Sequence, residues 1–414
     1  MLQSKSIIQK KNSINPSLFI NLVFGFFPIS FVLGSLIVNI NLLLFCCLSI
    51  FYLKSKILEI KFNRFTKTIF LFFFIVFFST SLSLIKSFYF EESTSHDFDR
   101  FIKSILFFRF FLFLVLVHLA NKLEILNFKI FFFSASLSVL IISLDIIYQY
   151  HFGFNLIGLK NIHYYNSGFF GEELVAGGYI QRFGFFAILL GIYLFKDKKY
   201  AKFIFSPIIV SILGLGILFS GNRMPLFLFI FGLCLIFLFN FRIKKILFLS
   251  LVVLLIILQI FISSNEAYKN RYYESFYERV LFMISPEIQT WHRQTWGEKE
   301  KVAEVEKSPR IKTLFFTTEI EPLQRRLFLT ALDTWKLNKI FGNGIKSFRV
   351  DCLKLKGPGV NIEENQFPGK KNRLCSSHPH NYYFEILTET GIVGLLVISI
   401  IGIAFLIFVF KNLK

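Results

Sequence analysis

Two histidines in the segment His378-Pro379-His380-Asn381 are the side chains best suited to acid–base chemistry in this sequence. A neutral imidazole can act as a general base near pH 7, because the unperturbed pKa of histidine is about 6.5. The segment ends a long polar region and directly precedes the last apolar stretch of the chain. The residue types alone leave two interpretations open. Either His380, with His378 beside it, is a catalytic base, or both histidines are packing residues that cap a helix.

Arginines in unusual places form a second group of candidates. Arg223 lies in a short turn between two apolar stretches, and Arg182 lies inside one. A charge in such a place is costly unless it reaches water or a partner, and it therefore indicates function by default. Arg325 and Arg326 are neighbours in the polar region. Because a guanidinium can hold phosphate through two parallel hydrogen bonds, Arg223 is a candidate phosphate ligand, with the adjacent pair and Arg182 as further functional candidates. The alternatives are a snorkelling Arg223 and a solvated face for the adjacent pair.

The motifs of several common enzyme classes are missing from the sequence. It contains no P-loop, no zinc-ligand spacing, no Rossmann glycine pattern and no Gly-x-Ser-x-Gly. We also find no acidic pair with metal-binding spacing and no internal repeat of the kind that many transporters carry. The sequence therefore offers no recognisable motif for binding a nucleotide, a dinucleotide or a metal ion.

The composition places these candidates in a membrane protein. Of 414 residues, 54% are hydrophobic and only 17% are charged, whereas soluble chains average about 25% charged residues. The charges cluster between apolar stretches long enough to cross a bilayer. We predict ten membrane-spanning helices: Leu18–Gly34, Leu36–Leu53, Phe65–Ile85, Ile105–Leu119, Phe128–Tyr150, Val175–Phe195, Phe203–Phe219, Pro225–Phe239, Ile246–Ile262 and Ile392–Phe410.

The distribution of Lys and Arg orients these spans. Every second loop is basic, as are both ends of the chain, so the positive-inside rule places both termini in the cytoplasm. The same rule explains the net charge of +20 without nucleic acid as a partner. Arg223, the loop Asn155–Glu173 and the polar region Ser263–Tyr383 are then expected on the outer side.

The polar region divides the chain. Residues 1–262 carry nine spans, residues 263–383 form one large outer loop, and residues 384–414 re-enter the membrane as the last span of a single membrane domain. A structureless loop of that length is uncommon, so we predict a small helical subdomain. Thr318–Asn338 has helical apolar spacing within it.

Two of the five cysteines, Cys352 and Cys375, lie in this outer loop. The outer compartment is oxidising in most bacteria, so we predict a disulfide between them, with two free thiols as the alternative. The other three lie within spans, where cysteine is usually a small apolar filler.

The chain resembles the O-antigen ligases and O-antigen polymerase-like membrane proteins. His380-Asn381, nine residues and then Gly391-x-x-Gly394 fit the ligase pattern His-[Asn/Ser/Gln]-x9-Gly-x-x-Gly. Three further segments, all of them before His380 in the chain, occur in the order typical of the family. They are Asp145 to Gln149, which is similar to Asp-x-x-Tyr-Gln, the turn Ser220-Gly221-Asn222-Arg223, and the stretch from Phe341-Gly342-Asn343-Gly344 to Cys352 and Cys375.

This resemblance implies an all-α, GT-C-like membrane glycosyltransferase with a helical periplasmic loop. Such proteins commonly have about twelve spans, and this sequence offers ten. The donor would be a glycan on undecaprenyl diphosphate, and the acceptor of a ligase would be a hydroxyl of lipid A–core. His380 would be the base, Arg223 and Arg326 would hold the leaving diphosphate, and the reaction would invert the anomeric centre. The resemblance implies neither a metal ion nor a cofactor. The compartment would be the inner membrane of a bacterium, with the site facing the periplasm.

Two other functions stay open at this stage. An O-antigen polymerase would use the same donor but another lipid-linked glycan as acceptor. A transporter of lipid-linked glycans would need charged residues along a path between spans, whereas the candidates here gather at one membrane face.

Overall fold

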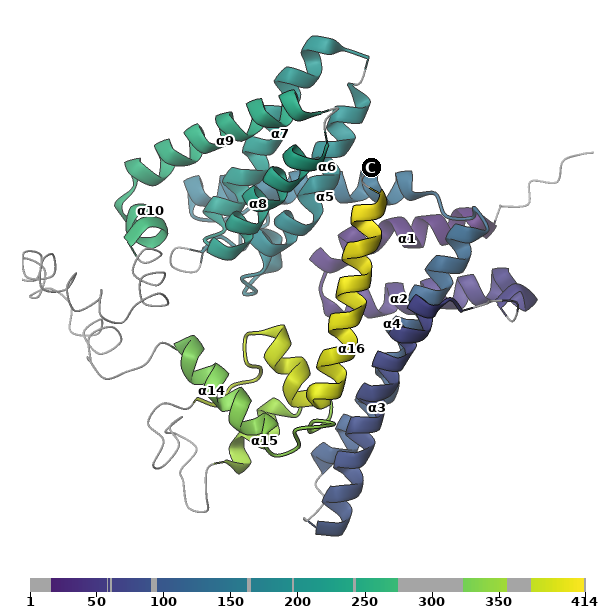
Figure 1. The fold of residues 1–414 in the computed structure, drawn as a ribbon. Helices are drawn as coiled ribbons and strands as arrows, with labels where there is room; N and C mark the ends of the chain where they lie inside the picture. The colour runs from purple at the N-terminus through teal and green to yellow at the C-terminus, as the bar shows by residue number, and fades with distance from the viewer. Residues whose placement is uncertain are drawn as a thin grey trace, which may run out of the picture. The chain divides into compact units, whose positions relative to one another are not determined.

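The computed structural model contains only helices as regular secondary structure among the residues it describes, which are 16–57, 59, 62–90, 95–161, 165–195, 197–240, 243–274, 323–355 and 374–412. Ten long or apolar helices account for most of them (Figure 1). They are α1 (Pro16–Val32), α2 (Ser35–Leu53), α3 (Arg64–Phe90), α4 (Ser95–Lys122), α5 (Phe128–Phe152), α6 (Ala176–Leu194), α7 (Lys199–Phe219), α8 (Arg223–Phe239), α9 (Lys244–Ser264) and α16 (Tyr382–Asn412).

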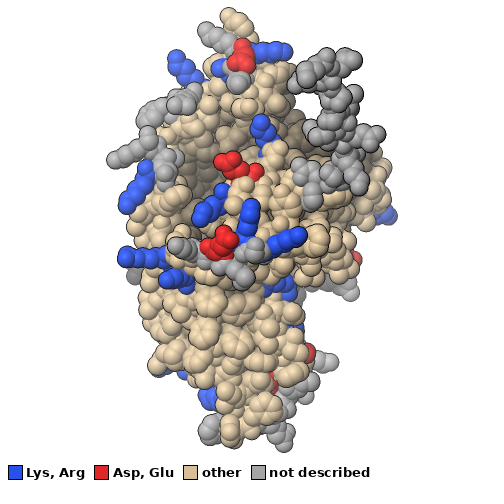
Figure 2. Space-filling view, turned by 90° about the vertical axis from the view of Figure 1, so that its right-hand side faces the viewer, with Lys and Arg blue, Asp and Glu red and all other residues tan. Residues whose placement is uncertain are grey.

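These helices confirm the prediction of a polytopic all-α membrane protein. Eight are long and apolar enough to cross a membrane, and α1 and α8 are shorter apolar helices. Each of the ten predicted spans coincides with one helix. A helix satisfies its own backbone hydrogen bonds, which the bilayer interior requires. Figure 2 shows one face of the molecule on which wide areas carry no charged side chain.

The chain divides into two compact units. The first comprises residues 1–54 and 119–306, and the second comprises residues 55–118 and 307–414. The division predicted from the sequence, at residues 262 and 383, stays a proposal. Of the predicted outer helix Thr318–Asn338, the structure describes α14 (Leu323–Trp335), and residues 318–322 lie outside the described part of the chain.

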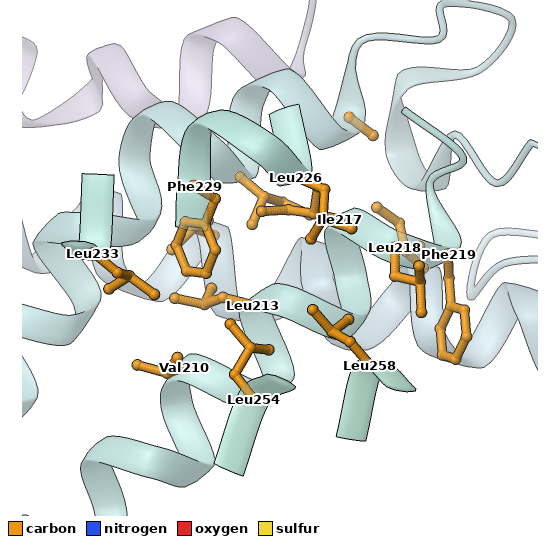
Figure 3. Close-up of a cluster of buried hydrophobic side chains, with 14 of the residues drawn as sticks. Val210, Leu213, Ile217, Leu218, Phe219, Leu226, Phe229, Leu233, Leu254 and Leu258 are labelled. Atoms are coloured by element: carbon orange, nitrogen blue, oxygen red, sulfur yellow. The ribbon is translucent and has the colours of Figure 1, made fainter. Parts of the chain in front are cut away.

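An apolar core formed by α5 to α9 holds the first unit together. Leu213 of α7 lies between Phe229 of α8 and Leu254 of α9 (Figure 3), and Ile217 of α7 belongs to the same core. All four side chains are almost completely buried. Small residues allow the close approach: a Cβ added at Gly214 would lie 2.3 Å from the Leu254 side chain. The ends of α6, α7 and α8 are therefore fixed with respect to one another.

The second unit is organised around an interruption of α16. Gly391 has a φ of 65° and a ψ of −165°, so the chain forms a short helix, breaks, and continues as a second helix. The second helix begins at Ile392, where the sequence analysis placed the start of the last span. A helix break leaves backbone groups that need partners outside the helix.

The segment Lys339–Gly344 supplies those partners. The amides of Ile392 and Val393 donate to the carbonyls of Lys339 and Ile340, at 3.0 and 3.2 Å. In return, the amides of Asn343 and Gly344 donate to the carbonyls of Thr388 and Glu389, each at 2.9 Å.

This contact between two backbones leaves no room for side chains. A Cβ at Gly391 would lie 2.2 Å from the carbonyl oxygen of Ile340, and one at Gly342 would lie 2.5 Å from the backbone of Glu389. From α3, Ser79 donates to the Glu389 carbonyl at 2.6 Å and accepts from the Gly344 amide at 3.1 Å. This close contact explains why the segment Phe341–Gly344 and the histidine motif each contain a glycine, at Gly342 and Gly391.

A disulfide completes the second unit. Cys352 in α15 (Phe348–Lys354) is bonded to Cys375, with a distance of 5.7 Å between their Cα atoms. Both cysteines belong to a small core with Leu327 and Ala331 of α14. The bond links α15 covalently to the segment that leads to the histidines.

Replacing Gly391 with alanine should destabilise the protein. The added methyl group collides with backbone atoms that cannot rotate away, and the left-handed conformation adds strain. We expect a clear fall in the melting temperature of the detergent-solubilised protein. Gly402→Ala, in the same helix with no atom within 4 Å of the added Cβ, should leave it unchanged or raise it. Equal melting temperatures for the two variants would contradict this account of the kink.

Removing the disulfide should destabilise the second unit by about 3 kcal/mol, because the bond closes a loop of roughly two dozen residues. The measurement is thermal unfolding of Cys375→Ser, together with maleimide labelling of the wild type with and without reductant. Cys234→Ser, at a free cysteine, is the control and should behave as wild type. Labelling of Cys352 and Cys375 without reductant would show that the bond does not form.

Candidate functional site

The candidate base, His380, lies immediately before the first helical turn of α16. Asn381 caps this turn, because its side-chain oxygen accepts from the amides of Tyr383 and Phe384 at 2.9 and 3.2 Å. Asparagine is among the best residues at such a position. The backbone at His380, next to the cap, therefore enters the helix in a fixed direction. This gives the His-Asn pair of the motif a local structural reason.

His380 also has an unusual backbone conformation. Its φ is 53°, in the left-handed region that residues other than glycine rarely adopt. Strained backbone of this kind occurs preferentially at functional sites. The side chain is exposed. A strained and accessible histidine supports the functional interpretation over the packing one.

The second histidine modifies the first. The rings of His378 and His380 have their centroids 4.1 Å apart, and the Ser377 hydroxyl lies 2.9 Å from Nδ1 of His378. Partial burial, followed by the nearby charge of His378, lowers the pKa of His380 below the usual 6.5. His380 is therefore mostly neutral near pH 7, and it loses its basic form only as the pH falls below the lowered pKa.

Arg326 lies on the helix that packs against the histidine segment. Phe328 of α14 contacts Phe384 of α16 with a ring-centroid distance of 4.9 Å, and Thr330 accepts from the Leu374 amide at 3.0 Å. Arg326 is half-buried at the beginning of α14. Arg325 precedes it in the same helix, but its side chain lies outside the described residues.

The two glycines of the histidine motif shape the backbone that follows His380. Gly391 forms the helix break described above, and Gly394 leaves space for the side chain of Thr390, which a Cβ would approach to 1.9 Å. Their predicted supporting role thus has a steric reason.

In the first unit, Arg223 is the first residue of α8 and is half-buried. The preceding turn, which includes Gly221 with a φ of 77°, is held from two sides. Asn222 donates to the Leu174 carbonyl at 3.0 Å, and Asn166 donates to the Phe219 carbonyl at 2.7 Å. The positive end of the α8 dipole and the guanidinium both favour an anion at this place.

Asp145 and Gln149 lie together, fully buried, near the end of α5. The Asp145 carboxylate accepts from the Leu156 amide at 2.9 Å. Gln149 accepts from the Gly168 amide at 2.8 Å and donates to the Leu159 carbonyl at 3.1 Å. These two residues hold the following loop in place. Arg182, in the second turn of α6, is exposed.

The predicted site residues are thus divided between the units. Asp145, Gln149, Arg182 and Arg223 belong to the first unit, whereas the histidines, Asn381, Arg325, Arg326 and the two glycines belong to the second. Within the described ranges, no three His, Cys, Asp or Glu side chains gather closely enough to hold a metal ion. A metal-independent reaction stays a prediction.

Sequence reasoning missed a buried ionic cluster in the second unit. Arg100 of α4 pairs with Asp97 and, at 3.4 Å, with Asp351 of α15. Ser87 donates to Asp97 at 2.9 Å. Asp351 directly precedes Cys352, so the cluster ties α4 to the disulfide-linked helix. The sequence signal was three charges beside apolar stretches, but nothing in it paired residues so far apart.

Part of the chain matches a known protein family. Residues 208–399, from within α7 to within α16, match the family model described as O-antigen ligase. The matched region contains Arg223, Arg325, Arg326, the disulfide and the whole motif from His380 to Gly394. No curated protein and no solved structure matches the chain. Members of this family are membrane enzymes that transfer lipid-linked glycans, as ligases or polymerases. The chain is therefore a polytopic membrane protein with an O-antigen ligase family domain over residues 208–399.

Proposed function

We propose that the protein is an O-antigen ligase, which transfers a glycan from undecaprenyl diphosphate to a hydroxyl group of lipid A–core. The observation that carries this proposal is the state of His380. It is exposed, strained, held by the Asn381 cap and lowered in pKa beside His378. These are the properties that a general base for a sugar hydroxyl needs.

In the proposed reaction, His380 accepts the proton of the acceptor hydroxyl. The acceptor oxygen then forms a bond to the anomeric carbon of the donor, while the bond from that carbon to the diphosphate oxygen breaks. Attack from the side opposite the leaving group inverts the anomeric centre. The diphosphate leaves with its electron pair and becomes more negative, so positive groups that bind it lower the barrier.

Arg223 and Arg326 are proposed to bind the diphosphate, with Arg325 and Arg182 as further candidates. A guanidinium keeps its charge when partly buried and offers parallel N–H donors that match phosphate oxygens. Arg223 and Arg326 are both half-buried. Because the donor bond supplies the energy, the reaction needs no nucleotide. The proposed setting is the bacterial inner membrane, with the site on the periplasmic face and both termini in the cytoplasm.

The first test is transfer by purified protein from an undecaprenyl-diphosphate glycan to lipid A–core. His380→Ala should reduce the rate by about 100- to 10,000-fold, the usual contribution of a general base. His96→Ala changes an exposed histidine in the first turn of α4 and should keep wild-type activity.

Two other results would change the assignment. Extension of a second lipid-linked glycan by wild type, with no transfer to lipid A–core, would identify a polymerase. Wild-type activity in His380→Ala would remove this residue from the base role.

Arg223→Lys should also lose most activity, because lysine keeps the charge but not the forked donor geometry. A hydrogen bond to a charged group is worth about 1.5–3 kcal/mol, so we expect a fall of roughly ten- to hundredfold in kcat/KM. Arg64→Lys is the matched control, because Arg64 is likewise the first residue of a helix. If the Arg223 variant matched this control, Arg223 would not bind the diphosphate.

A further inference from the structure

One face of α5 is continuously apolar and exposed. Its members follow one another at intervals of three or four residues, which places them on one side of a helix. They are Phe133, Leu137, Ile141 and Leu144, and Phe152 is exposed on the same side eight residues further on. The opposite side of α5 packs into the core of the first unit. Because α5 is one of the helices long and apolar enough to span the membrane, we expect this exposed face to be its lipid-facing surface.

The lipid-facing surface continues into the loop that follows α5. Residues Gly153–Asn161 form a hairpin, closed by a bridge between Phe154 and Lys160. The Tyr148 ring lies between its neighbours, with centroid distances of 4.4 Å to Phe152 and 5.9 Å to Phe154. The hairpin therefore folds back along the same side of α5.

The tip of this hairpin is apolar and projects outward. Leu156 and Ile157 expose 62% and 64% of their surface. Asn155 and Gly158 occupy the first and fourth positions of the turn, as is common in β-turns, but both central positions carry large aliphatic side chains instead of polar or small ones. The only basic residue of the hairpin, Lys160, lies at its base and is exposed, where a lysine can reach lipid headgroups.

The backbone of the hairpin is satisfied within the protein to a degree that a loop in water does not need. The Asn155 side chain accepts from the amides of Ile157 and Leu159, at 3.2 and 2.8 Å. Asp145 accepts from Leu156 at 2.9 Å, and the amides of Gly153, Asn155, Gly158 and Asn161 all donate to backbone carbonyls. Irregular backbone is tolerated at membrane depth when its polar groups have such partners.

From these observations we infer that the Gly153–Asn161 hairpin is a membrane-interface anchor, with Leu156 and Ile157 inserted among the lipids of the bilayer. The lipid surface is the occupant because the apolar tip continues the lipid-facing stripe of α5. The buried Asp145, Gln149 and Asn155 make the insertion possible by satisfying the backbone.

The anchor has a consequence for Arg223. The chain that leaves the hairpin carries Asn166 and Leu174, which hydrogen-bond to the turn before α8. The depth of the hairpin in the membrane and the depth of Arg223 are thus fixed by one loop. Such an anchor would keep a phosphate-binding arginine at the level of lipid headgroups.

Depth can be measured with a nitroxide label in protein reconstituted into phosphatidylethanolamine–phosphatidylglycerol vesicles. The three free cysteines are replaced first, and the label is placed at Ile157→Cys or, independently, at Leu156→Cys. Leu144→Cys on the α5 stripe gives the lipid reference. Glu172→Cys, exposed in the same loop, gives the water reference. Collision with oxygen reports lipid, and collision with a neutral nickel chelate reports water.

We expect the ratio of oxygen to nickel accessibility at residues 156 and 157 to exceed that at residue 172 several-fold and to approach that at residue 144. A ratio at both tip positions equal to that at residue 172 would overturn the anchor and place the hairpin in water. Low accessibility to both reagents would also overturn it, because the tip would then be covered by protein. Agreement between the two tip positions excludes a local effect of one label.

Discussion

The backbone contact between Lys339–Gly344 and the break in α16 is the constraint on which the second unit depends. A helix interrupted next to a membrane exposes amides and carbonyls that cannot be left without partners. Here both ends of the break are satisfied by one segment, and Ser79 of α3 adds a further hydrogen bond. Because the fit is between main chains, only glycine is possible at Gly342 and Gly391. The same contact brings α3, α14 and α16 into one arrangement.

In the first unit, the backbone of the loop after α5 also needs hydrogen-bond partners. There, side chains supply them instead of another main-chain segment. Asp145, Gln149 and Asn155 are buried, yet each one has backbone partners. Buried polar groups are costly unless they are hydrogen-bonded, and these are satisfied by the loop that they hold. The part of Asp145 and Gln149 in a motif is therefore explained by architecture, whereas the residues proposed for the chemistry lie at helix ends. Arg223 begins α8, and His380 precedes the cap of α16.

Much of this could be predicted from the sequence because the bilayer imposes a simple rule. Hydropathy located all ten apolar helices, and the start of the last span coincided with the break at Gly391. What could not be predicted depends on partners far apart in the chain. The pairing of Arg100 with Asp351 spans 251 residues, and that of Ser79 with Glu389 spans 310. The left-handed conformation of His380 was equally hidden, since no residue type announces it.

The histidine segment is ordered by constraints on both sides rather than by burial. Cys375 is covalently fixed to α15, Pro379 restricts the backbone between the two histidines, and Asn381 caps the helix that follows. A side chain buried for rigidity could not meet a bulky glycan, whereas an exposed side chain on a loose loop would be poorly placed for catalysis. For the base proposed at His380, anchoring the chain at both ends resolves this conflict, because it leaves the imidazole accessible while limiting its movement. The ionic cluster of Arg100 strengthens the attachment at the disulfide, since Asp351 is adjacent to Cys352.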